Sequence, residues 1–147
     1  MPDIWAGTAA ASLRFTAVTA PKRDSARRQV GPALEAMNIF LRWLIPTVEK
    51  FPRSQKFLLG DRIQAGALDV LERLIEATYE RDRGGTLRAA NLGIEKLRRL
   101  IRLAFDLKHL DERRYEHAAR ALDAIGRQIG AWTKAHRGQE VSGEGAA

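Results

Sequence analysis

The sequence KFPRSQKFLLGDRIQ, residues 50–64, decides the fold because it combines a helix break, a new helix start and a group of cations. Pro52 disfavours helical geometry at Phe51, so we predict that one helix ends there and another begins just after. Apolar residues beyond the break begin the inner face of the second helix. The cations surround the corner between the two helices: Lys50, Arg53, Lys56 and Arg62. The stretch therefore predicts a structural joint with a positive rim rather than an active site.

Apolar residues recur at alternating spacings of three and four from residue 33 to residue 137, a pattern that predicts helices. No strand-type alternation competes in this region. We expect Pro32 to occupy the first position of the first helix. Ser54, Thr86 and Asp111 are the expected N-caps of the second, third and fourth helices. The inner faces of the second and third helices are predicted to comprise Leu59, Ile63, Ala67, Val70, Leu74 and Ala77, and Leu87, Ala90, Ile94, Leu97, Ile101 and Ala104.

Two glycine-containing sequences mark further helix ends. The Arg83–Gly85 sequence is expected to stop the second helix, and the fourth helix is expected to fade at Gly138. Four helices with such stripes and short connections predict an all-α, antiparallel up-and-down four-helix bundle over residues 33–137. Residues 1–32 are expected to form a flexible basic leader, an extension or a misassigned start, and residues 138–147 a disordered tail.

A second set of apolar residues widens the helical stripes. A broad stripe is normal in a bundle, so these residues can be additional core. Where they stay exposed, they are instead a surface for self-association or for a partner. The residues of this flank are Phe40, Ile45, Leu68, Leu71, Ile75, Leu92, Leu100, Leu103 and Phe105.

The composition favours a single basic domain. The chain has 147 residues and carries 25 Lys and Arg against 18 Asp and Glu, a net charge of +7. Such a surface raises the local concentration of polyanions, so nucleic acid or an acidic protein patch is a natural partner, although the charge can equally serve solubility. Cysteine is absent, which excludes disulfides and thiolate metal sites and suits a reducing compartment. We therefore expect a cytoplasmic protein, and no apolar run approaches the ~20 residues that a bilayer requires.

The sequence offers little catalytic chemistry. None of the serines lies in a recognisable nucleophile motif, and Gly84-Gly85 lacks the lysine and the preceding strand of a phosphate loop. His109, His117 and His136 lack the paired Glu-x-x-His pattern of a di-metal bundle, and we expect each to be solvated or to cap a helix. The sequence therefore predicts no enzyme, no metal and no cofactor.

A second cationic cluster lies on the third helix, where Lys96, Arg98, Arg99 and Arg102 occupy two turns. Neighbouring cations on one helix face repel each other, so binding of a phosphate backbone is one interpretation. Pairing with acidic residues of a neighbouring helix, such as Glu72 or Glu76, is the other, and both are open. Few aromatic residues lie outside the stripes, so any nucleic-acid contact should be to the backbone and sensitive to salt.

Several stretches together resemble a known family. They are LRWLIPTVEK, the KFPRSQKFLLGDRIQ joint, LERLIEATYE, LRAANLGIEKLRRLIRLAFDL and YEHAARALDAIGRQIGAWTK, which together span about residues 34–135. They are similar to Avd, the accessory variability determinant of diversity-generating retroelements. Avd belongs to a wider group of small four-helix proteins that includes the ribosomal-RNA intervening-sequence proteins.

The resemblance implies properties that composition and periodicity do not. It implies a ring-like homo-oligomer, a homopentamer, that binds the error-prone reverse transcriptase of the retroelement and nucleic acid, both RNA and DNA, in support of mutagenic retrohoming. The protein would itself be non-catalytic. The alternative is an oligomeric interaction module whose positive charge serves solubility only. The candidate residues for contact with nucleic acid or the polymerase are Arg53, Lys56, Arg62, Lys96, Arg98, Arg99 and Arg102.

Overall fold

The first long helix ends at the Phe-Pro sequence, as the sequence predicts. The computed structural model describes residues 31–146, so the expected leader lies outside the described residues. The helices are α2 (Pro32–Glu49), α3 (Arg53–Gln55), α4 (Asp61–Tyr79), α5 (Gly84–Asp106) and α6 (Glu112–Ala146), with a π-helical turn η1 (Lys56–Gly60) between α3 and α4. No strand occurs within residues 31–146.

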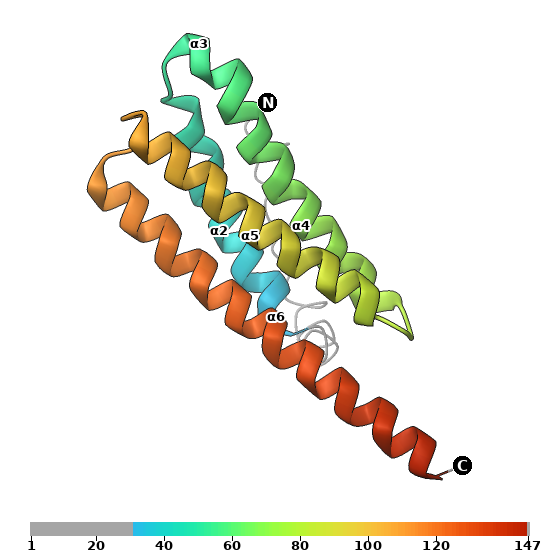
Figure 1. Ribbon diagram of the computed structural model, residues 1–147. Helices are drawn as coiled ribbons and strands as arrows, with labels where there is room; N and C mark the ends of the chain where they lie inside the picture. The colour runs from blue at the N-terminus through green and yellow to red at the C-terminus, as the bar shows by residue number, and fades with distance from the viewer. Residues whose placement is uncertain (1–30, 147) are drawn as a thin grey trace, which may run out of the picture. The chain divides into compact units, whose positions relative to one another are not determined.

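The four long helices lie side by side as a bundle (Figure 1). Helix α4 packs on α5, α5 packs on α6, and α2 closes the bundle against α4 and α6. Successive helices run in opposite directions because the connections between them are short. The all-α four-helix bundle expected from the sequence is therefore confirmed. No helix in the described residues combines the length and the hydropathy needed to cross a membrane.

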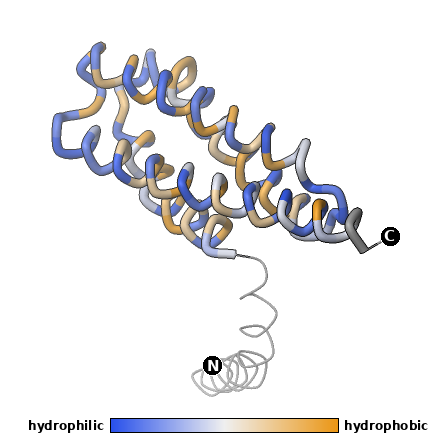
Figure 2. Tube along the Cα trace, turned by 60° about the horizontal axis from the view of Figure 1, so that its bottom comes forward, coloured by the Kyte–Doolittle hydropathy of each residue, from blue (hydrophilic) through white to orange (hydrophobic). Residues whose placement is uncertain are grey.

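The core consists of the predicted inner faces. Hydrophobic positions recur along every helix of the bundle (Figure 2). All twelve stripe residues named above for the second and third helices are buried. Burial of a large aliphatic side chain stabilises the fold by about 1.5–3 kcal/mol, so these stripes hold the four helices together.

The second apolar flank divides between core and surface. Phe40 is buried, Leu71 and Leu100 are half-buried against the core, and Phe105 is half-buried and stacks on Tyr115. The remaining members are exposed: Ile45, Leu68, Ile75, Leu92 and Leu103. The core interpretation thus holds for part of the flank, and the exposed part stays a predicted surface for self-association or a partner.

The joint between α2 and α4 is tightly built. The N–H of Phe51 donates to the carbonyl of Val48 at 3.0 Å, and the Phe51 side chain is buried. A Cβ at Gly60 would lie 2.8 Å from Cγ1 of Val48, so only glycine fits this approach. The expected N-cap at Ser54 is wrong, because the carbonyl of Pro52 already accepts the N–H of Gln55 at 2.9 Å and Pro52, two residues earlier, is the N-cap.

The other predicted caps have mixed outcomes. Asp111 caps α6 as predicted, since its Oδ1 accepts the N–H of Arg114 at 2.8 Å. Thr86 does not cap α5, because its hydroxyl donates to Glu80 Oε2 at 2.6 Å and the helix already begins at Gly84. Helix α4 ends at Tyr79, so the two glycines after Arg83 start a helix rather than stop one.

Helix α6 does not fade at Gly138 but continues to Ala146 and extends past the ends of the other helices (Figure 1). The hydroxyl of Ser142 donates to the carbonyl of Gly138 at 3.0 Å. The described side chains from Arg137 to Gly143 are exposed. This extension is held by backbone hydrogen bonds along the helix and not by packing on the core.

Candidate nucleic-acid interface

Three of the candidate cations belong to the joint. Lys56 makes an ion pair, with its Nζ 2.7 Å from Glu49 Oε2. Arg53 on α3 and Arg62 on α4 are exposed. Neither has an acidic partner within 4.0 Å in the described part of the chain. Arg53 and Arg62 are thus available to an external anion, whereas Lys56 is already paired.

Arg98 joins helices α5 and α6. Its guanidinium lies 3.1 Å from Glu95 Oε1 and 3.3 Å from Asp123 Oδ1, and Nη2 also donates to the carbonyl of Leu122 at 3.5 Å. Its Nε is buried without an acceptor in the described residues. A side chain committed to two helices in this way has a structural role.

Arg102 is also engaged by its neighbours. Its Nε donates to Asp106 Oδ1 at 3.0 Å, and the guanidinium lies 5.9 Å from the ring centres of Phe105 and Tyr115. The Tyr115 hydroxyl and, next, the Asp106 carboxylate raise the pKa of Arg102. Arg102 therefore stays protonated, but the carboxylate of Asp106 already neutralises part of its positive charge.

Lys96 and Arg99 point away from the core on the outer face of α5. Both are exposed, and neither has an ion-pair partner among residues 31–146. The exposed Leu92 and Leu103 lie one turn from them on the same face. The α5 cluster therefore divides into a pair that faces α6, Arg98 and Arg102, and a pair that faces outward.

Arg98 does pair with an acidic residue of a neighbouring helix, as one interpretation predicts, but the partner is not Glu72 or Glu76. Glu76 pairs with Arg73 on its own helix, at 3.4 Å. Arg98 instead takes its cross-helix partner, Asp123, from α6, because it lies on the α6-facing side of α5 whereas Glu72 and Glu76 belong to α4. Helical periodicity locates a side chain on a face but does not tell which neighbouring helix covers that face.

The joint and the C-terminal part of α5 border an apolar groove. Arg62 and Leu103 both line this groove, and Arg99 lies one turn from Leu103 on α5. The groove has a volume of about 660 Å³. Its apolar wall consists of exposed or partly exposed side chains: Phe57, Leu58, Leu103 and Leu107. The arrangement places hydrophobic surface next to one cation, Arg62, and one carboxylate, Asp61.

The histidines differ from one another. His117 is exposed and its ring lies 4.4 Å from that of Trp43, and His109 is half-buried with its ring 5.6 Å from that of Phe51. The solvated or capping role expected for His136 is wrong: its exposed fraction is 7%, and α6 continues for ten residues beyond it. The spacing of Glu140, one turn after His136 on α6, is a sequence signal that could have indicated a contact between the two residues. No such signal exists for Asp82, the other acidic neighbour of His136, because it is distant in the sequence.

The structural role of Arg98 leads to a stability prediction. We expect Arg98→Ala to lower the free energy of unfolding by about 1–2 kcal/mol, because Asp123 and the Leu122 carbonyl lose a charged hydrogen-bond donor. Arg99→Ala, a matched change at an exposed and unpaired position, should stay within about 0.5 kcal/mol of the wild type. Urea denaturation of both variants measures the difference, and equal effects would contradict the assignment.

The fold and these cations together define a class, that of small basic four-helix-bundle proteins with cations on the joint and on the outer face of α5. The chain belongs to the bAvd-like family, whose model matches residues 33–136. The match covers the whole bundle except the extension of α6, and it indicates an Avd-type accessory protein. No curated protein matches the sequence.

Proposed function

We propose that the protein is a non-catalytic accessory protein of a diversity-generating retroelement. In this role it binds the error-prone reverse transcriptase and nucleic acid, both template RNA and cDNA, in support of mutagenic retrohoming. It acts in the cytoplasm as a ring-like homo-oligomer, a homopentamer. Membership of the bAvd-like family, whose model matches residues 33–136, supports this proposal.

The observation that carries the nucleic-acid role is the set of exposed cations that have no acidic partner in the described residues. Among the seven candidates these are Arg53, Arg62, Lys96 and Arg99. A phosphate backbone neutralises such charges and releases its own counterions, which favours binding at low salt. The bundle residues 33–137 carry twenty Lys and Arg against fourteen Asp and Glu, so the folded part itself attracts polyanions.

The apolar groove supports a protein partner beside the nucleic acid. Phe57 and Leu58 are about two-thirds exposed, at 65% and 66%, and they lie across the groove from Leu103 and Leu107. Exposed apolar surface of this kind, rimmed by polar residues, is typical of protein interaction sites. We propose that the reverse transcriptase covers this groove while nucleic acid contacts the neighbouring cations.

A salt titration tests the nucleic-acid role. We expect the purified protein to bind a labelled RNA and a DNA of the same sequence, with log K falling linearly as log salt rises. Fluorescence anisotropy measures the slope, and light scattering on the same sample measures the oligomeric state. A monomer that binds neither strand at low salt would contradict the proposal.

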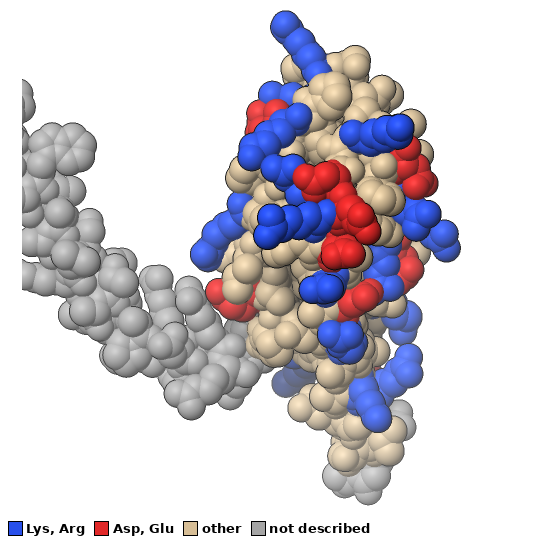
Figure 3. Space-filling model, turned by 90° about the vertical axis from the view of Figure 1, so that its left-hand side faces the viewer, with Lys and Arg blue, Asp and Glu red and all other residues tan. Residues whose placement is uncertain are grey.

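A second candidate function is an oligomeric interaction module whose charge serves solubility. The spread of the cations favours it: Figure 3 shows Lys and Arg along most of one face of the bundle, with Asp and Glu among them. In that case the apolar groove would still bind a protein, but nucleic acid would bind weakly and without preference for any one group of cations.

A further inference from the structure

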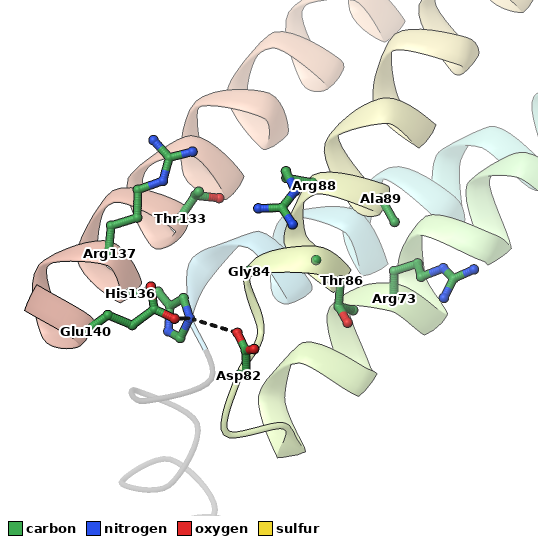
Figure 4. Close-up of a pocket in the computed structure, with 11 residues that line it drawn as sticks. Arg73, Asp82, Gly84, Thr86, Arg88, Ala89, Thr133, His136, Arg137 and Glu140 are labelled. Carbon is green, nitrogen blue, oxygen red and sulfur yellow. Dashed lines mark ion pairs between the residues drawn. The ribbon is translucent and has the colours of Figure 1, made fainter. Parts of the chain in front are cut away.

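A cluster of three potential metal ligands lies where the turn between α4 and α5 meets α6. Asp82 belongs to the turn, and His136 and Glu140 stand one turn apart on the same face of α6. The three side chains point toward one another in Figure 4, across a pocket of about 440 Å³. They are remote from the groove between the joint and α5, since none of them lines it.

The three ligand atoms converge on one point. Nε2 of His136 lies 3.1 Å from Glu140 Oε1 and 3.7 Å from Asp82 Oδ1, and all three atoms lie within 4.8 Å of one another. Metal–ligand distances of about 2.0–2.2 Å place the ligand atoms of a tetrahedral site about 3.3–3.6 Å apart. Small adjustments of the two exposed carboxylates would bring all three atoms to a shared ion.

The histidine provides an independent indication of a ligand. Its exposed fraction is 7%, and its Nε2 makes no hydrogen bond of acceptable geometry in the described residues, although Glu140 Oε1 lies 3.1 Å away. A buried polar atom without a partner costs about 1–3 kcal/mol, so native proteins rarely leave one unused. Coordination of a metal ion would satisfy this nitrogen. The side chains of Asp82 and Glu140 are 88% and 54% exposed, which leaves space for water as a fourth ligand.

We propose that Asp82, His136 and Glu140 bind a divalent transition metal ion, for which Zn²⁺ is the best match. One imidazole and two carboxylates form a ligand set that zinc accepts. The ion would connect the α4–α5 turn to α6 at the point where α6 begins to extend beyond the bundle. Its role would be structural, and it is independent of the nucleic-acid role proposed above. The proposal departs from the expectation, based on sequence, that the protein holds no metal.

Positive charge nearby favours an anion as the competing ligand. Arg73, Arg88 and Arg137 line the same pocket, and the N-terminus of α5 has no side-chain cap. Arg73 and Arg137 point away from the cluster in Figure 4, whereas Arg88 Nη1 and Asp82 Oδ1 both lie 3.8 Å from the position that a Cβ at Gly84 would take. Nε2 of His136 also lies next to two carboxylate oxygens, and these would repel a phosphate group at that position. The geometry at the histidine therefore favours a cation.

The test is a titration of the untagged 147-residue chain with Zn²⁺, monitored by calorimetry and by thermal unfolding. We expect one ion per chain and a rise in Tm of about 5 °C or more at saturation. His136→Gln should abolish binding, and Asp82→Asn and Glu140→Gln should each weaken it at least tenfold, since these two exposed positions tolerate the change. His117→Gln, which removes an exposed histidine elsewhere on α6, is the matched control and should bind as the wild type does.

Three results would overturn the proposal. The first is the absence of a Zn²⁺-dependent change in the wild type, and the second is equal binding by the wild type and by the Asp82 and Glu140 variants. The third comes from inorganic phosphate as the probe: if phosphate raises the Tm of the wild type and Zn²⁺ does not, the pocket is an anion site. Because Asp82→Asn and Glu140→Gln change only exposed carboxylates, their result stands even if His136→Gln fails to fold.

Discussion

Gly93→Ala is expected to destabilise the bundle by about 1–2 kcal/mol, although alanine is the better helix former by about 1 kcal/mol. A Cβ at position 93 would lie 2.5 Å from Cγ2 of Val70, a distance at which one of the two helices must move. Val70 is buried on α4, and α4 and α5 share an extensive contact. Overpacking of such a contact costs about 1–3 kcal/mol, which outweighs the gain in helix propensity.

A double-mutant cycle with Val70→Ala tests the cause of this loss. Val70→Ala alone removes buried methyl groups and should cost about 1–2.5 kcal/mol. In the double variant the methyl group added at position 93 enters the space that the Val70 side chain vacates. The loss of stability should therefore fall short of the sum of the two single losses by about 1 kcal/mol or more. Urea denaturation measures all four corners of the cycle.

Gly130→Ala is the matched control for this cycle. Gly130 also lies inside a helix, but beyond its own stretch of helix backbone no atom of the described residues lies within 4 Å of the Cβ that it would acquire. The substitution should therefore stabilise the protein by up to about 1 kcal/mol through helix propensity alone. Equal gains from Gly93→Ala and Gly130→Ala would show that α4 and α5 do not approach each other as closely as the structure indicates.

The close α4–α5 contact illustrates how far the sequence predicts this fold. The inner faces of both helices follow from spacing alone, because burial of a stripe depends on helical periodicity and on little else. The end of α2 before Phe51 follows from the steric effect of Pro52. The sequence does not indicate why position 93 is a glycine. Only the packing of α4 on α5 shows that a larger residue there would collide with Val70.

Predictions failed where local alternatives compete. Ser54 and Thr86 are good N-cap residues, yet the Pro52 carbonyl and the Glu80 carboxylate provide other hydrogen bonds. Asp111 was predicted correctly because its short loop offers its carboxylate directly to the N–H of Arg114. The choice between such alternatives depends on chain geometry over several residues, which residue type alone does not encode.

The candidate sites depend even more on tertiary structure. The sequence places Arg98 and Arg99 side by side, but only the position of α6 shows that the first is bound to Asp123 and the second is free of ion pairs among residues 31–146. Likewise, Asp82 and His136 are 54 positions apart in the numbering and become neighbours only when the α4–α5 turn reaches α6. Composition predicts that cations are plentiful, and packing decides which of them remain available.

Lys96 and Arg99 are the α5 cations that packing leaves available. The double variant Lys96→Glu/Arg99→Glu is therefore expected to lose nucleic-acid binding, the largest effect that we predict. If the outward pair on α5 contacts phosphates, removing both contacts should lower the slope of log K against log salt by about two. Reversal of both charges should also weaken binding at least tenfold at moderate salt, because two carboxylates then repel the backbone. Anisotropy titrations with RNA and DNA at several salt concentrations measure both quantities.

The control for this prediction is Arg113→Glu/Arg120→Glu on α6, which changes the net charge by the same amount. Arg113 and Arg120 are exposed and have no ion-pair partner in the described part of the chain. If nucleic acid binds at the joint and the outer face of α5, this variant should bind within a few-fold of the wild type. Equal losses in the two variants would mean that net charge alone attracts nucleic acid, and the solubility interpretation would then be the better one. Because none of the four positions is buried, unchanged Tm values should show that neither variant loses binding through unfolding.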